Sequence, residues 1–143
     1  MNQEELIEKV VTSFYEKATT DFLIGHQFRK IQEFKSGDPL APPIEAFAHH
    51  IPRIVVFWKI QMLNLPLPST QSSFNLPEAH AYLKIRRGEL DRWVLLFNET
   101  LDSFEKSHSE NSSYLDLINQ WREKLDFFRK VFFRSPVIFP KKN

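Results

Sequence analysis

The chain has 143 residues, an apolar fraction of 42% and 14 phenylalanines, which is ample material for one packed domain and excludes a disordered chain. Nineteen Lys and Arg against 18 Asp and Glu give a formal net charge of +1, so no strong positive field favours a nucleic-acid partner. The sequence contains no cysteine, which excludes disulfides and thiolate metal sites.

Composition predicts neither a signal peptide at the N-terminus nor a membrane span. The first five residues, MNQEE, are acidic and lack an apolar stretch, so they do not form a signal peptide. No later segment is long and apolar enough to span a bilayer. We therefore expect a cytoplasmic protein with no membrane partner.

Helical periodicity dominates the chain between clusters of proline. The spacing of apolar residues, together with these breakers, predicts helical segments over Asn2–Thr19, Leu23–Ile31, Ile44–Leu63, Pro77–Leu83, Gly88–Lys106 and Ser113–Arg134. The connections are expected to be a loop over Glu33–Pro43, a Pro-rich loop before Pro77, a polar linker over Ser107–Ser113 and an irregular tail over Ser135–Asn143. No segment alternates with a period of two for long enough to form a sheet. The predicted class is all-α, as a single domain over residues 1–143.

Pro52 lies inside the helix that is predicted over Ile44–Leu63. Proline lacks a backbone N–H, so it either kinks this helix around His50 or lies in the first turn of a helix that begins late. Periodicity alone leaves both arrangements open.

Five histidines are the first candidates for chemistry: His26, His49, His50, His80 and His108. Their spacing matches neither a zinc site nor the Glu-x-x-His pairs of di-iron bundles. At about 100° per residue, His50 lies near the edge of the apolar face of its helix, whereas His49 points to solvent. The ordinary interpretation of His50 is a half-buried histidine that is satisfied by a backbone carbonyl.

Tyr15, Trp93 and His80 each allow an ordinary interpretation: a boundary tyrosine, a core tryptophan and a surface histidine. Together with His50, however, they lie on helices dense in aromatic residues. One imidazole that ligates a metal, surrounded by apolar walls, is typical of a buried flat cofactor.

Taken in chain order, these residues resemble the group III truncated haemoglobins of bacteria. The resemblance rests first on Phe14-Tyr15-Glu16-Lys17, with Asp21, Gly25 and Phe28 after it. It continues with His50 and the following Phe57-Trp58, and then with His80 and the following Asp91-Arg92-Trp93, Leu96-Phe97 and Glu99. It spans about Leu6 to Phe104, and the Asp-Arg-Trp block is its most specific part.

The resemblance implies a truncated globin fold, which is a helical sandwich around a haem pocket, with haem b as cofactor. His80 would be the proximal ligand to iron, Phe28 would stack against the porphyrin, and the distal pocket would contain Tyr15, His50 and Trp93. Helix geometry adds that Arg53, one turn after His50, could reach a haem propionate. Three further aromatic residues are expected in the pocket walls or the adjacent core: Phe47, Phe57 and Trp58.

The family resemblance implies binding of dioxygen, nitric oxide or carbon monoxide by a monomer or weak dimer, with a reductase as a partner for recycling iron. Nitric oxide detoxification and peroxidase-like chemistry are further expectations that the sequence does not separate. The alternative is a globin-like interaction module that binds no haem.

A third hypothesis concerns the last helix, whose basic and aromatic residues are compatible with a lipid surface. A core helix with a solvated charged face is favoured, because Trp121, Leu125, Phe128 and Phe132 form one apolar stripe. Phe133 falls outside this stripe and is expected to pack against the tail at Val137–Phe139.

Overall fold

The computed structural model describes residues 1–65 and 76–140 of the chain. Six α-helices lie in these ranges: α1 (Gln3–Ala18), α2 (Gly25–Arg29), α3 (His50–Leu63), α4 (Leu76–His80), α5 (Arg87–Ser107) and α6 (Ser112–Arg134). Two short 3₁₀ helices complete them, η1 (Ile44–Phe47) and η2 (Ala81–Leu83). No strand occurs in the described ranges, and the all-α prediction is confirmed. Most of the predicted Pro-rich loop and the end of the predicted tail, residues 66–75 and 141–143, lie outside the described residues.

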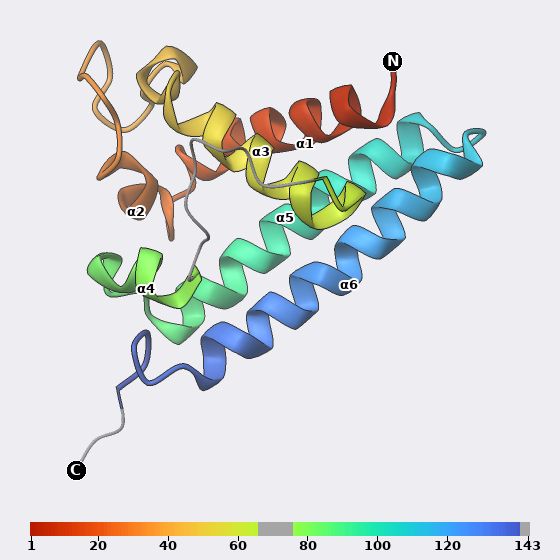
Figure 1. The fold of residues 1–143 in the computed structure, drawn as a ribbon. Coiled ribbons are helices and arrows are strands. Elements are labelled where there is room, and N and C mark those ends of the chain that lie inside the picture. Colours follow the sequence, from red (N-terminus) through yellow and green to blue (C-terminus); the bar gives the residue numbers. More distant parts are fainter. Residues whose placement is uncertain (66–75, 141–143) are drawn as a thin grey trace.

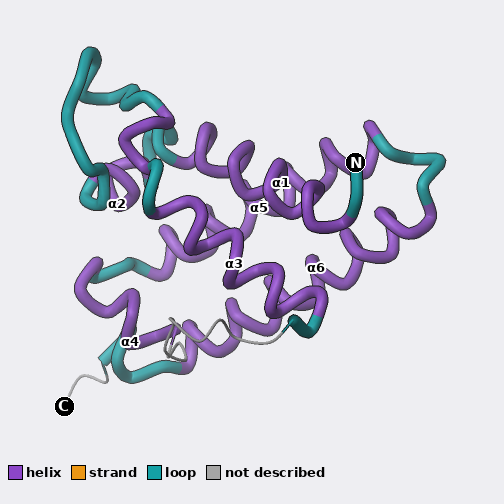
Figure 2. The backbone as a smooth tube through the Cα atoms, turned by 45° about the horizontal axis from the view of Figure 1, so that its top comes forward, coloured by secondary structure: helices purple, strands orange, loops and turns teal. Residues whose placement is uncertain are grey.

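Four long helices build the body of the molecule (Figure 1). α5 and α6 form an antiparallel hairpin, and α1 packs against both α5 and α3. The short elements α2, α4 and η2 lie near the end of the hairpin where α5 begins and α6 ends. Figure 2 shows that the long connection between α2 and α3 extends away from the helical body.

Local sequence explains where the long helices begin. The Asn2 side chain accepts a hydrogen bond from the Glu5 N–H at the start of α1, and Asn111 does the same for Tyr114 at the start of α6. At the start of α5, the Glu89 carboxylate accepts from the Arg86 N–H at 2.9 Å. These caps satisfy N–H groups that have no partner within the helix. The boundaries of α1, α5 and α6 accordingly agree with the predicted ones to within one residue.

The prediction of one continuous helix over Ile44–Leu63 is wrong. The chain forms η1 over Ile44–Phe47, and α3 begins only at His50. Pro52 is therefore the third residue of α3, where its missing N–H costs no helical hydrogen bond. Of the two arrangements that the sequence left open, the structure has the late start.

The apolar stripes of the long helices meet in one large core. The predicted stripe of α1 is buried in full and includes Leu6, Val10 and Phe14. A second, smaller cluster of Ile85, Leu90 and Phe132 lies where the beginning of α5 meets the end of α6. The two clusters share Leu76 and Trp93 as partly buried neighbours, so the short elements around His80 are packed between them.

Candidate functional site

A cavity of about 730 Å³ lies among the helices, and each of the six α-helices contributes side chains to its walls. This volume falls in the range of roughly 300–1,000 Å³ that is usual for sites of small molecules and cofactors. Eight of the nine site residues predicted from the sequence line it: Tyr15, Phe28, His50, Arg53, Phe57, Trp58, His80 and Trp93. Residues from all parts of the described chain therefore converge on one space.

Tyr15 and His50 form a hydrogen-bonded pair in the wall of this cavity. The Tyr15 hydroxyl lies 2.8 Å from His50 Nε2, although the two residues are 35 positions apart. Tyr15 is 5% exposed and stands on the buried face of α1, so the interpretation as a boundary tyrosine is wrong. His50 is the first residue of α3 and faces inward, as the periodicity predicted.

Burial keeps both members of this pair uncharged. It lowers the pKa of His50 to about 4, with a further contribution from the positive charge of Arg53. Burial, with a smaller contribution from Tyr82, raises the pKa of Tyr15 above its ordinary value. At neutral pH a phenol therefore faces a neutral imidazole. Either Tyr15 donates to Nε2, or Nε2–H donates to the phenol oxygen and leaves the phenol proton available to another acceptor.

His80 is held by its own helix. Its Nδ1 lies 2.8 Å from the Leu76 carbonyl oxygen, one turn earlier in α4. A carbonyl can only accept, so Nδ1 carries the proton and Nε2 presents its lone pair. Burial lowers the pKa of His80, and the bond to Leu76 opposes this effect only in part. His80 is thus a neutral, oriented imidazole, and not the surface histidine that its short element also allowed.

Aromatic rings fix the orientation of the His80 imidazole. Its ring centre lies 5.4 Å from that of Trp93 and 5.2 Å from that of Phe132, at tilted angles. Trp93 also contacts Phe132 at 6.2 Å and Phe28 at 5.9 Å, both in edge-to-face arrangements. The structure thus places Trp93 between Phe28 and His80, whereas Tyr15 contacts Phe28 at 5.4 Å and His50.

The remaining predicted wall residues separate into two groups. Phe57 and Trp58 are nearly buried and line the cavity. Phe47 is fully buried but does not line it, because η1 directs this ring into the core, 6.2 Å from the ring of Tyr15. Its assignment as a cofactor contact is therefore corrected to that of a core residue behind Tyr15.

Arg53 is an exposed cation in the cavity wall. Among the described residues it has neither a hydrogen-bonding partner nor a carboxylate in an ion pair. Nearby, the Glu33 carboxylate binds the side chain of His49 and accepts from the His49 N–H at 2.9 Å. The hydrogen bonds from His49 lower the pKa of Glu33. This arrangement ties the long loop to the start of α3 and leaves Arg53 available to an anionic group.

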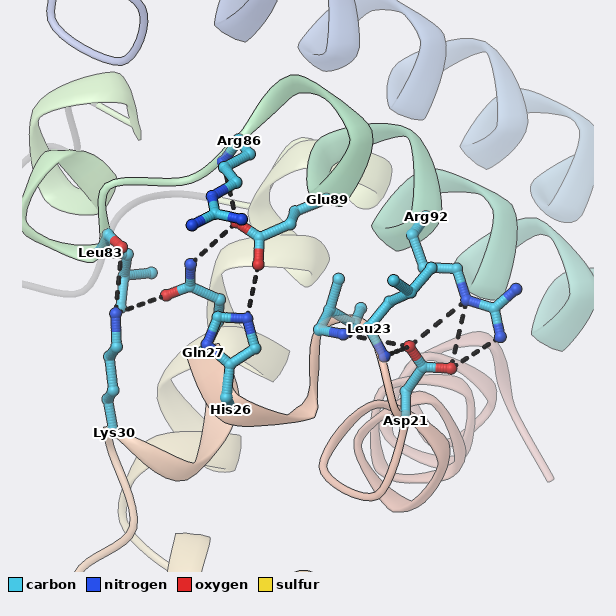
Figure 3. A network of polar contacts seen from close by, with 10 residues as sticks. Asp21, Leu23, His26, Gln27, Lys30, Leu83, Arg86, Glu89 and Arg92 are labelled. Carbon is cyan, nitrogen blue, oxygen red and sulfur yellow. Dashed lines mark hydrogen bonds and ion pairs between the residues drawn. The ribbon is translucent and has the colours of Figure 1, made fainter.

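A polar network that was not predicted from the sequence joins α2 to the start of α5 (Figure 3). Glu89, on α5, contacts His26 at 2.6 Å and accepts from Gln27 at 3.1 Å. Lys30 then donates to the Gln27 side chain and to the Leu83 carbonyl. The network joins α2 to α5 and to η2, the element that follows His80. The only signal for it in the sequence was Glu89 at the third position of a helix, which is also an ordinary capping residue.

Asp21 and Arg92 form an ion pair although they are 71 positions apart in the sequence. Arg92 Nη2 donates to Asp21 Oδ1 at 2.7 Å, and the Asp21 carboxylate also accepts from two backbone N–H groups, those of Leu23 and Ile24. Burial raises the pKa of Asp21, but these hydrogen bonds outweigh it and the pKa lies below its ordinary value. The ion pair fastens the turn before α2 to α5 (Figure 3).

Within residues 1–65 and 76–140, no group of three or more His, Asp or Glu side chains gathers at a spacing that could hold a metal ion. A metal held by a single protein ligand, as in a porphyrin, needs no such group.

Comparison with known proteins yields no relative for this chain: no family model, curated protein or solved structure matches it. The interpretation of the cavity therefore depends on its own geometry.

Proposed function

We propose that the protein binds haem in this cavity, with His80 Nε2 as the protein ligand to iron. The observation that carries the proposal is the state of His80: a partly buried, neutral imidazole whose Nδ1 donates to the Leu76 carbonyl. Metal-ligating histidines usually donate their other ring N–H in this way, which fixes the tautomer and raises the basicity of the ligating nitrogen. An imidazole binds a metal in the plane of its ring, so packing of Trp93 and Phe132 against His80 is compatible with ligation.

The cavity fits a flat, largely apolar cofactor. Its volume of about 730 Å³ and its aromatic lining suit such a group, and Arg53, which has no partner among the described residues, could bind a carboxylate at the edge of that group. The packing of α1 against α3 and of α5 against α6 is compatible with the helical sandwich expected from the resemblance.

Haem would supply an iron that binds a diatomic ligand such as dioxygen, nitric oxide or carbon monoxide. Of the three residues that the resemblance placed in the distal pocket, Tyr15 and His50 are the ones that we assign to that ligand, because Trp93 packs against His80 instead. When His50 Nε2–H donates to the phenol oxygen, the Tyr15 proton is free to donate to a ligand atom with partial negative charge. A buried donor of this kind favours ligand retention and redox chemistry, such as nitric oxide removal or reaction with peroxide, over transport.

The proposal predicts a haem spectrum that depends on His80. Wild-type protein produced with a haem precursor should show a strong Soret band, which shifts when the reduced protein binds carbon monoxide. His80→Ala should weaken haem binding at least about tenfold and change the ferric spectrum, because the ligating nitrogen is lost. Added imidazole should restore part of the original spectrum. Absorbance and haem titration measure these effects.

His108→Ala is the matched control. His108 also bonds a carbonyl one turn earlier, that of Phe104, but it lies at the end of α5 and does not line the cavity. This variant should retain the wild-type spectrum. A folded wild-type protein with no Soret band after haem is supplied would contradict the proposal and favour a haem-free interaction module.

A further inference from the structure

Six basic residues surround the place where α5 begins and α6 ends. We call this group the cationic pole, and it consists of Lys84, Arg86, Arg87, Arg129, Lys130 and Arg134. Both ends of the helical hairpin are visible in Figure 1, and these residues belong to the end near α4. None of them takes part in the contacts that hold Tyr15, His50 or His80.

Most of the charge of the cationic pole is not neutralised. Arg129 pairs with Asp91 at 2.8 Å and Lys130 with Asp126 at 2.9 Å. The other four cations form no ion pair within the part of the chain that the structure describes: Lys84, Arg86, Arg87 and Arg134. All four are exposed. This end of the molecule therefore presents an excess of positive charge to its surroundings.

Apolar side chains lie among these cations. The Arg87 guanidinium lies 5.0 Å from the ring centre of Phe133 and 4.5 Å from that of Phe139. The two rings contact each other at 6.1 Å, which confirms the expected packing of Phe133 against the tail. Phe133 nevertheless stays 40% exposed, and Val137 in the same tail is 45% exposed. The pole thus combines exposed cations with exposed apolar groups.

The opposite end of the hairpin has the opposite character. Asp102 and Glu105, near the end of α5, share the single cation Arg122, and Glu110 and Asp116 follow nearby in the chain. A net charge of only +1 therefore conceals a polarised molecule. Such a charge distribution orients a protein relative to a charged surface before contact is made.

Against the expectation of no membrane partner that composition gave, we propose that the cationic pole docks on the surface of a membrane that contains anionic phospholipids. Cations near such a surface are attracted to it, and exposed aromatic and aliphatic groups between them can enter the headgroup region. An acidic protein would need carboxylates at fixed complementary positions. Mobile headgroups meet cations at any spacing, which suits long side chains that come from a turn and two helix ends. No helix in the described ranges is long and apolar enough to cross a bilayer, so the contact is peripheral.

The test is co-sedimentation of the full chain with vesicles of phosphatidylcholine, with and without phosphatidylserine. Wild-type protein should sediment only with the anionic vesicles, and added salt should release it. Replacing Lys84, Arg86 and Arg134 together by Gln should lower the partition coefficient on the order of 100-fold, because each basic residue near the surface contributes roughly fivefold. These three side chains carry no ion pair, so the variant should keep its helical content by circular dichroism.

Two further variants separate charge from apolar contact. The control variant replaces Lys9, Lys17 and Lys106 together by Gln. These three lysines are also exposed, so the variant removes the same charge from other surfaces. Its binding to the vesicles should stay within about twofold of wild type. Val137→Ser should weaken binding without changing its dependence on salt. Equal binding to neutral vesicles, no binding at low ionic strength, or binding to an acidic protein without binding to vesicles would each overturn the proposal. The assay needs no haem, so it stands apart from the proposed function.

Discussion

At the scale of single residues, the state of His50 is set by burial. Its imidazole is neutral because an enclosed position disfavours the charged form, and the positive charge of Arg53 acts in the same direction. Tyr15 supplies the hydrogen-bonding partner that a half-buried imidazole requires. A wall residue with a pKa near 4 also ties the stability of the fold to pH.

The free energy of unfolding should rise with pH across the His50 titration. The folded pKa is about 4 and the ordinary value is 6.5, so the unfolded chain binds more protons between these values. The stability is complete above pH 6.5 and is lost as the pH falls toward 4. After allowance for solvent screening, wild type should lose about 1–2 kcal/mol more than His50→Gln over this interval.

Urea titrations at several pH values measure this difference. Tyr15→Phe should keep the pH dependence, because burial and not the hydroxyl is its main cause, although the variant should be less stable at every pH. Identical slopes for wild type and His50→Gln would show that the imidazole is not desolvated.

At the scale of elements, the start of α3 decides which side chains enter the cavity. A helix continuous from Ile44 would carry Pro52 in its interior, where proline costs about 3 kcal/mol. The observed helix begins at His50 instead, and Glu33 binds the N–H of the preceding His49. This late start brings His50 to the cavity and sends Phe47 into the core.

Pro52→Ala distinguishes these two arrangements in solution. In the first turn, proline removes no helical hydrogen bond and restricts the unfolded chain, so its replacement should lower the free energy of unfolding by about 0.4–1 kcal/mol. A proline in the helix interior would give the opposite sign, with a gain approaching about 3 kcal/mol. Chemical denaturation followed by circular dichroism gives the sign directly.

At the scale of the whole molecule, polar contacts bring together segments that are distant in the sequence. Asp21 and Arg92 join the turn before α2 to α5 across 71 positions. The Glu89 network joins α2 itself to the first turn of α5 and continues to η2. Together these contacts hold Phe28 on α2 against Trp93 on α5.

Loss of the Asp21 carboxylate should therefore be far more costly than loss of a surface carboxylate. The Asp21 side chain is 6% exposed, so Asp21→Ala leaves Arg92 and two N–H groups without their acceptor. We expect a loss of about 2–4 kcal/mol.

Asp126→Ala is the matched control, because Asp126 pairs with Lys130 four residues along α6 and both side chains are more than half exposed. This variant should lose less than about 0.5 kcal/mol. Similar losses for the two variants in urea denaturation would contradict a structural role of the Asp21–Arg92 pair.

The sequence by itself determined most of the helical framework. The stripes of α1, α5 and α6 follow from apolar spacing, because a helix buries whatever its 3.6-residue period places on one face. The same periodicity separated His50 from His49, whose side chain is 91% exposed. Local signals were sufficient because helix hydrogen bonds and capping groups lie within a few residues of each other.

Only the tertiary structure decided which side chains meet. Tyr15 could have been a boundary residue and His80 a surface residue, and each became part of the cavity because α3 packs on α1 and α4 packs beside Phe132. Local spacing does not predict that Asp21 pairs with Arg92 or that Gln27 pairs with Glu89. Periodicity fixes the face of a helix on which a residue lies, but the burial, the pKa and the partner of that residue depend on the element packed against that face.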